Sequence, residues 1–125
     1  MSEISPLAIV IEDYSDTAFI FQQALEMAGY ETRVLSDGAE AQSLLENTVP
    51  ALVVLDLHIP SIDGAALLKK IRNDPRLTKT RVILATADAL LAQRITDQAD
   101  MVLLKPISFT QLNQLAARYF AHPKE

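Results

Sequence analysis

The sequence predicts a doubly wound α/β domain, in which a five-stranded parallel sheet has helices on both faces. Short apolar runs without polar alternation recur along the chain, and such runs are typical of strands covered on both sides. Segments with helical periodicity separate these runs, and an alternating strand–helix order favours parallel pairing through crossover connections. The length of 125 residues favours a single domain that spans residues 1–125.

Five segments are predicted to be strands. Four of them are nearly continuous runs of β-branched residues and leucine, and they are expected to be buried. The fifth segment, Glu31–Leu35, alternates polar and apolar residues, which favours a place at an edge of the sheet. The four apolar strands are Leu7–Ile11, Ala51–Leu55, Val82–Ala85 and Met101–Leu104.

Five segments with apolar residues at three- to four-residue spacing are predicted to be helices. Gly29 follows the first of them as a helix stop, and Asp37 begins the second as a capping residue. Phe19 and Phe21 in the first helix are both expected to pack in the core or against another helix. The predicted helices are Ser15–Ala28, Asp37–Asn47, Asp63–Asn73, Ala89–Gln98 and Ser108–Ala121.

Composition excludes several classes of function. The chain has no cysteine, which excludes disulfides, thiolate metal sites and cysteine nucleophiles. Its net charge of −5 argues against direct binding to nucleic acid. No apolar run approaches the ~18 residues of a membrane span, and the acidic start of the chain is unlike a secretory signal. We therefore expect a cytoplasmic protein that does not bind membranes.

Polar residues follow four of the predicted strands, at the point where each strand ends. Glu12 and Asp13 follow the first strand, Asp56 the third, Thr86 the fourth and Lys105 the fifth. The carboxyl ends of parallel strands meet at one edge of such a sheet, and this edge is where ligands bind. These residues are therefore expected to form one site.

The chemistry of this cluster favours a divalent cation. Three carboxylates that lie close together repel one another, and Lys105 offsets only one of their charges. Mg²⁺ prefers oxygen ligands and is usually bound through one or two carboxylates together with phosphate oxygens. A carboxylate can also attack phosphorus to give an aspartyl phosphate, so Asp56 is a candidate nucleophile, with Thr86 and Lys105 positioned to hold phosphoryl oxygens.

With these motifs in place, the sequence resembles the receiver domain of two-component response regulators, a chemotaxis-regulator-like (βα)5 fold of the flavodoxin-like class. The resemblance extends from Leu7 to about Tyr119. The matching motifs are IVIED with Glu12-Asp13, LVVLDLHIPSIDG with Asp56, ILATA with Thr86, and LLKPIS with Lys105-Pro106. All four occur in order and at suitable spacing, which makes the resemblance specific.

The resemblance implies a role for each matched residue. Asp56 would accept a phosphoryl group from the phosphohistidine of a histidine kinase or phosphotransfer protein. Asp13, Asp56 and the backbone carbonyl of His58 would bind Mg²⁺, with Glu12 assisting through water. Thr86 and Lys105 would contact the phosphoryl group. The Lys105–Pro106 bond would be cis, and His58 and Asp88, two positions after Asp56 and Thr86, would influence how long the phosphoryl group survives.

The sequence departs from the family pattern at the expected output region. Val102 stands where family members usually carry a tyrosine or phenylalanine that swings inward on activation. The stretch between Thr86 and Lys105 is also a few residues shorter than is common. The phosphorylation residues are present, whereas the usual aromatic readout is absent.

We therefore expect a signalling switch that catalyses its own phosphorylation and dephosphorylation. It would have no external substrate to turn over, so we do not expect an enzyme. Its partners would be a histidine kinase or phosphotransfer protein and a downstream protein or fused output domain; homodimerisation stays open. One alternative is a receiver-like interaction module that is never phosphorylated, which Val102 favours. Another is a phosphatase of the haloacid dehalogenase type, but such enzymes need an acid two residues after the nucleophile, where this chain has His58.

Overall fold

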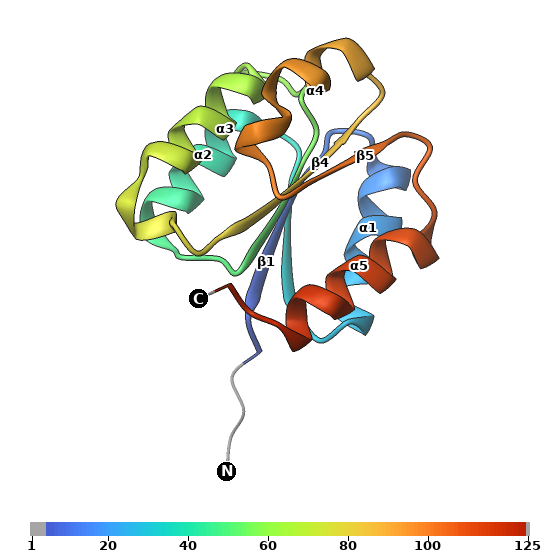
Figure 1. Cartoon of the computed structure of the whole chain (residues 1–125). Coiled ribbons are helices and arrows are strands. Elements are labelled where there is room, and N and C mark those ends of the chain that lie inside the picture. The colour runs from blue at the N-terminus through green and yellow to red at the C-terminus, as the bar shows by residue number, and fades with distance from the viewer. Residues whose placement is uncertain (1–4, 125) are drawn as a thin grey trace.

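The computed structural model describes residues 5–124 and contains a five-stranded parallel sheet between two layers of helices (Figure 1). The strand order is β2-β1-β3-β4-β5, so the predicted doubly wound fold is confirmed. The alternating strand, β2, lies at an edge as expected. The strands are β1 (Leu7–Ile11), β2 (Glu31–Leu35), β3 (Leu52–Leu55), β4 (Arg81–Thr86) and β5 (Met101–Leu104).

The helices agree with the sequence pattern except at α4. The predicted helix Ala89–Gln98 instead ends at Ile95 and continues as a 3₁₀ turn over Thr96–Gln98. The Thr96 hydroxyl donates to the Ala92 carbonyl at 2.7 Å, and the Ala99 N–H bonds to the Thr96 carbonyl, which is the shorter 3₁₀ spacing. None of the helices within residues 5–124 is long and apolar enough to span a membrane. The α-helices are α1 (Ser15–Met27), α2 (Gly38–Asn47), α3 (Gly64–Asn73), α4 (Ala89–Ile95) and α5 (Phe109–Ala121).

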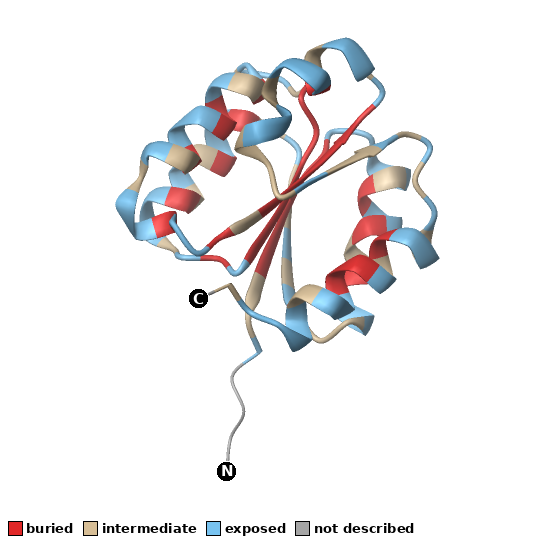
Figure 2. Ribbon diagram, in the orientation of Figure 1, coloured by how far each residue is buried: buried red, intermediate tan, exposed pale blue. Residues whose placement is uncertain are grey.

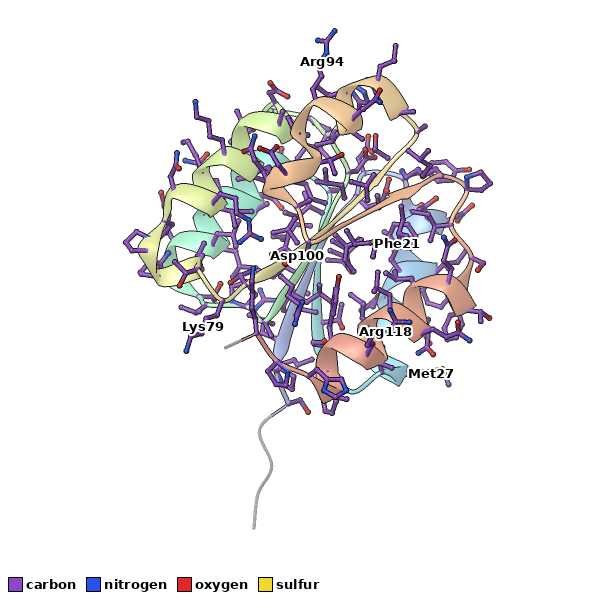
Figure 3. The ribbon with its side chains drawn as sticks, viewed as in Figure 1. Phe21, Met27, Lys79, Arg94, Asp100 and Arg118 are labelled. Carbon is purple, nitrogen blue, oxygen red and sulfur yellow. The ribbon has the colours of Figure 1, made fainter. Side chains whose placement is uncertain are left out.

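Two apolar layers, one on each face of the sheet, form the core. Alternate strand residues point to opposite faces, so Ile9 packs toward α2, α3 and α4, whereas Val10 packs toward α1 and α5. The central strands are buried on both sides (Figure 2). Phe21 points from α1 toward the sheet (Figure 3). The expectation for Phe19 is wrong: its side chain is 61% exposed, because two helical positions rotate it away from the face that Phe21 occupies.

The strand register brings the ends of four strands to one edge of the sheet. Ile11 at the end of β1 pairs with Leu55 at the end of β3, and Leu55 pairs with Leu84 in β4. Thr86 at the end of β4 pairs with Leu104 at the end of β5. The sequence positions that follow these ends therefore share one edge, and the order of the sheet reverses there between β1 and β3.

The loop between β3 and α3 is held by a close backbone contact. The Gly64 N–H donates to the Leu57 carbonyl at 3.2 Å, and Asp63 caps α3 by accepting from the Ala65 N–H at 3.1 Å. A Cβ atom on Gly64 would lie 2.5 Å from both the Cα and the carbonyl oxygen of Leu57. Glycine is therefore required sterically at the start of α3, one residue beyond the loop that follows Asp56.

We predict that Gly64→Ala destabilises the fold by about 1–3 kcal/mol, since the added methyl meets backbone that cannot move aside. Urea unfolding would measure the change. Ala66→Gly, at an exposed position in the same turn, is the control and should cost no more than about 1 kcal/mol. A Gly64→Ala protein as stable as wild type would show that the Leu57 contact relaxes freely.

Candidate functional site

Three carboxylates from two strand ends form an acidic cluster. Glu12 and Asp13 follow β1, and Asp56 follows β3; each offers a carboxylate oxygen within 4.8 Å of the others. Glu12 and Asp56 are buried, with exposures of 1% and 6%, whereas Asp13 is exposed. The cluster therefore has two buried carboxylates and a third that is open to solvent.

Lys105 joins the buried part of this cluster from the end of β5. Its Nζ atom donates to Glu12 Oε1 at 2.6 Å and to Asp56 Oδ2 at 3.0 Å. The side chain is about one-fifth exposed, so its ammonium group is partly shielded from water. The Lys105–Pro106 peptide bond is cis, as the resemblance implies. The strand-end rule thus brought together four of the predicted site residues.

Burial and hydrogen bonding shift the pKa values of Glu12 and Lys105 in opposite directions. Burial raises the pKa of the Glu12 carboxyl above its usual value, although hydrogen bonds from Lys105 and from the Tyr14 N–H oppose this. Burial alone would lower the pKa of Lys105, but its bonds to Glu12 and Asp56 outweigh burial and raise that pKa. Lys105 is therefore a cation at neutral pH, and the Glu12 carboxyl is easier to protonate than an ordinary exposed glutamate.

Thr86 is fully buried at the end of β4, and its hydroxyl oxygen accepts a hydrogen bond from the Asp88 N–H at 3.0 Å. Within residues 5–124 the hydroxyl donates no hydrogen bond, so its proton is available to an acceptor. Ala87 beside it is small and exposed. Thr86 lies at the predicted edge but is engaged with the backbone of the next loop rather than with the carboxylates.

His58 and Asp88 make a contact that sequence reasoning did not identify. The His58 N–H donates to Asp56 Oδ1 at 3.0 Å, while the His58 ring Nε2 lies 2.9 Å from Asp88 Oδ2. Asp88 also caps α4, because its Oδ1 accepts from the Leu91 N–H at 2.9 Å. These bonds, first that from Leu91 and then that from His58, lower the pKa of Asp88. The available signal was an aspartate directly before a helical pattern.

The donor set of the cluster suits a hard divalent cation. All three groups are carboxylates, which Mg²⁺ prefers over nitrogen or sulfur ligands. Three carboxylates against the single Lys105 ammonium leave two negative charges, which equal the charge of one divalent ion. The exposed position of Asp13 leaves room for the water ligands that Mg²⁺ retains.

Comparison with known proteins identifies the family of this chain. The profile of the response regulator receiver domain matches residues 8–117. The chain belongs to this family. It is a receiver domain of two-component response regulators, and the predicted fold and family are thereby confirmed.

Relatives of this receiver domain include longer proteins. It is 30% identical over 110 residues to the DNA-binding dual master transcriptional regulator RpaA of Synechocystis sp., covering 86% of this chain and 46% of that protein. The chain thus spans less than half the length of this relative.

Solved receiver structures resemble it closely. The signal receiver domain of a putative Luxo repressor protein from Vibrio parahaemolyticus has a TM-score of 0.82 at 28% identity, covering 94% of this chain and 92% of that one. The signal receiver domain of a signal transduction histidine kinase from Syntrophus aciditrophicus has a TM-score of 0.82 at 29% identity, with coverages of 94% and 91%. Both are receiver domains, and each match covers 94% of this chain.

We predict that Glu12→Gln stabilises the metal-free protein at pH 7 by about 1 kcal/mol, because a buried charge is removed while Lys105 keeps Asp56 as a partner. The folded pKa of Glu12 lies above 4.5, so ionised Glu12 destabilises the fold above that folded pKa. The difference in the free energy of unfolding between Glu12→Gln and wild type should shrink as the pH falls from the folded pKa of Glu12 toward 4.5. It should vanish below pH 4.5.

Urea unfolding across pH 4–8 without divalent cations would measure this difference. Glu46→Gln, an exposed carboxylate on α2, is the control and should change stability by less than about 0.5 kcal/mol. A destabilised Glu12→Gln protein would mean that the Lys105 bond outweighs burial.

Proposed function

We propose that Asp56 accepts a phosphoryl group from the phosphohistidine of a histidine kinase or phosphotransfer protein. The observation that carries this proposal is the pair of donors on its carboxylate. Lys105 Nζ bonds to Oδ2 at 3.0 Å, and the His58 N–H bonds to Oδ1 at 3.0 Å. Phosphoryl transfer depends chiefly on positioning and charge neutralisation, and both donors supply these without reorganisation.

The transfer conserves atoms and charge. One Asp56 carboxylate oxygen attacks phosphorus, and a P–O bond forms while the P–N bond of the donor breaks. The electron pair stays on the leaving imidazole nitrogen, which takes up a proton. Lys105 Nζ and the Thr86 hydroxyl then donate hydrogen bonds to the phosphoryl oxygens. Attack by water later releases inorganic phosphate and restores the Asp56 carboxylate.

We also propose that the acidic cluster binds Mg²⁺. Glu12 (through water), Asp13 and Asp56 would hold the ion together with the backbone carbonyl of His58. When bound, Mg²⁺ supplies neutralisation of the charge on the transferring phosphoryl oxygens. The carboxylate-only donor set and the excess of two negative charges support this assignment.

The proposed role is a signalling switch in the cytoplasm. Phosphorylation would alter the surface that the domain presents to a downstream protein or a fused output domain. The domain would turn over no external substrate, so we do not propose an enzymatic role. Direct contact with nucleic acid is not proposed for the acidic domain itself; in a longer protein, a further domain would make such contact.

We predict that acetyl phosphate and Mg²⁺ add one phosphoryl group to the wild-type protein, and that Asp56→Asn abolishes the adduct. The amide that replaces the carboxylate would be at least about a thousandfold weaker as a nucleophile, since the negative charge is lost. Intact-mass measurement detects the adduct, and EDTA should prevent its formation. An adduct of equal yield in wild type and Asp56→Asn would reject the site assignment.

We further predict that His58→Ala and Asp88→Ala each shorten the half-life of the phosphoryl group by about threefold or more. The bond between these side chains joins the two loops that flank Asp56, and its loss opens the site to water. Loss of adduct mass with time, after removal of acetyl phosphate, gives the half-life. The double variant should match the single variants because they break one contact. Half-lives equal to that of wild type would reject this role.

A further inference from the structure

The edge of the sheet opposite the acidic cluster contains a cavity of about 290 Å³. Its walls come from the segments around the starts of β1, β3 and β4, from Tyr30 just before β2, and from the end of α5 with the residues that follow it. The start of β1 and the end of α5 lie at one end of the molecule, and α4 lies at the other (Figure 1). The cavity is therefore separate from the site around Asp56.

Most of the residues that line this cavity are aromatic or aliphatic. The rings of Tyr30 and Phe120 meet edge to face, with their centroids 5.6 Å apart. Phe120 and Val49 are 43% and 59% exposed, so part of this apolar lining is uncovered within residues 5–124. Binding sites for small organic molecules have mainly apolar walls and volumes from roughly 300 Å³ upward. The cavity therefore has the size and lining for the apolar body of a small ligand.

The charged residues that line the cavity, among those the structure describes, are all basic. They are Lys79, Arg81 and Lys124. Lys124 Nζ donates to Asp100 at 3.1 Å, but the same carboxylate also pairs with Arg72 at 3.2 Å. The whole chain carries a net charge of −5, so a cavity bordered by cations stands out against the rest of the molecule. This local charge favours an anionic ligand.

Arg81 is held in place but has no anionic partner. Its Cζ lies 4.2 Å from the centroid of the Tyr119 ring, and its Nη2 donates to the His122 carbonyl at 3.0 Å. Its Nε is buried and has no hydrogen-bond partner within residues 5–124. No carboxylate among these residues forms a salt bridge with it. Buried donors in native proteins nearly always have an acceptor, so a guanidinium in this state beside a cavity indicates a missing anion.

We propose that this cavity binds a small aromatic carboxylate. The ring of the ligand would lie against the aromatic wall around Tyr30 and Phe120, and its carboxylate would accept hydrogen bonds from the Arg81 guanidinium. Arginine binds carboxylates in this way with charge-assisted bonds, and Lys79 adds a second positive charge. An inorganic anion would leave the apolar wall unused, whereas a neutral aromatic molecule would leave Arg81 without a partner. The proposal does not depend on phosphorylation of Asp56.

The test is an NMR titration of the whole chain with 2-naphthoate, without a phosphodonor. We expect a Kd of about 1 mM or tighter, which is ordinary efficiency for a ligand of this size. Shifts should concentrate at the amides of Leu7 and Ala51 and at the Arg81 Nε–H, whereas the amides of His58 and Ala87 should stay in place. The matched amide, 2-naphthamide, has the same shape without the charge and should bind at least about tenfold more weakly.

Three variants assign the contribution of each charge. Arg81→Met keeps an apolar side chain without the guanidinium and should weaken 2-naphthoate at least about tenfold. Lys79→Met, at an exposed position that folding does not need, should weaken it about two- to threefold. Arg94, exposed on α4, projects away from the rest of the molecule (Figure 3). Arg94→Met is therefore the control and should change the affinity less than about twofold.

Four results would overturn the proposal. The first is the absence of saturable shifts in wild type up to about 10 mM 2-naphthoate. The second is equal binding of 2-naphthamide, which would show an apolar hollow without a carboxylate site. The third is unchanged affinity in both Arg81→Met and Lys79→Met, and the fourth is a set of shifts centred on Asp56. Phosphorylation of Asp56 is measured separately by intact mass, so neither proposal falls with the other.

Discussion

The contact between Lys105 and the two buried carboxylates is the interaction on which the site depends. Glu12 and Asp56 follow different strands, and their charges repel each other in a largely dry environment. The ammonium group lies within hydrogen-bond distance of both, at 2.6 and 3.0 Å. Without it, two buried charges would face each other unpaired, a far more costly arrangement than a paired one.

The remaining site follows from an excess of negative charge around that contact. Asp13 adds a third carboxylate on the exposed side, which a cation can reach from solvent. Around the carboxylates stand donors rather than further acids: the His58 N–H points at Asp56, and the Thr86 hydroxyl has an uncommitted proton within residues 5–124. Without a metal ion, the excess negative charge of these carboxylates is unfavourable. The same charge, together with the nearby donors, suits the site to a divalent ion and a phosphoryl group.

The sequence predicted the contacts that follow from how the strands pair. It did not predict the contacts that depend on loop paths and side-chain rotamers. Parallel pairing places the ends of strands together, so the proximity of Glu12, Asp56 and Lys105 could be predicted from three short motifs. The bond between His58 and Asp88 could not, because it depends on the path of two loops and on rotamers. The bond between the Thr86 hydroxyl and the Asp88 N–H is different, because a threonine after a strand often bonds to nearby backbone and the sequence alone makes this reading available.

The close approach of Gly64 to Leu57 has a mechanical consequence. The start of α3 lies directly against the chain that follows Asp56, so that the position of this helix and that of the segment constrain each other. The loop from β4 to α4 is held by hydrogen bonds of Asp88 with Thr86, His58 and Leu91. The segment that carries Asp56 is therefore braced by a steric contact with α3 in addition to its hydrogen bonds, and any side chain at position 64 would push directly on this segment.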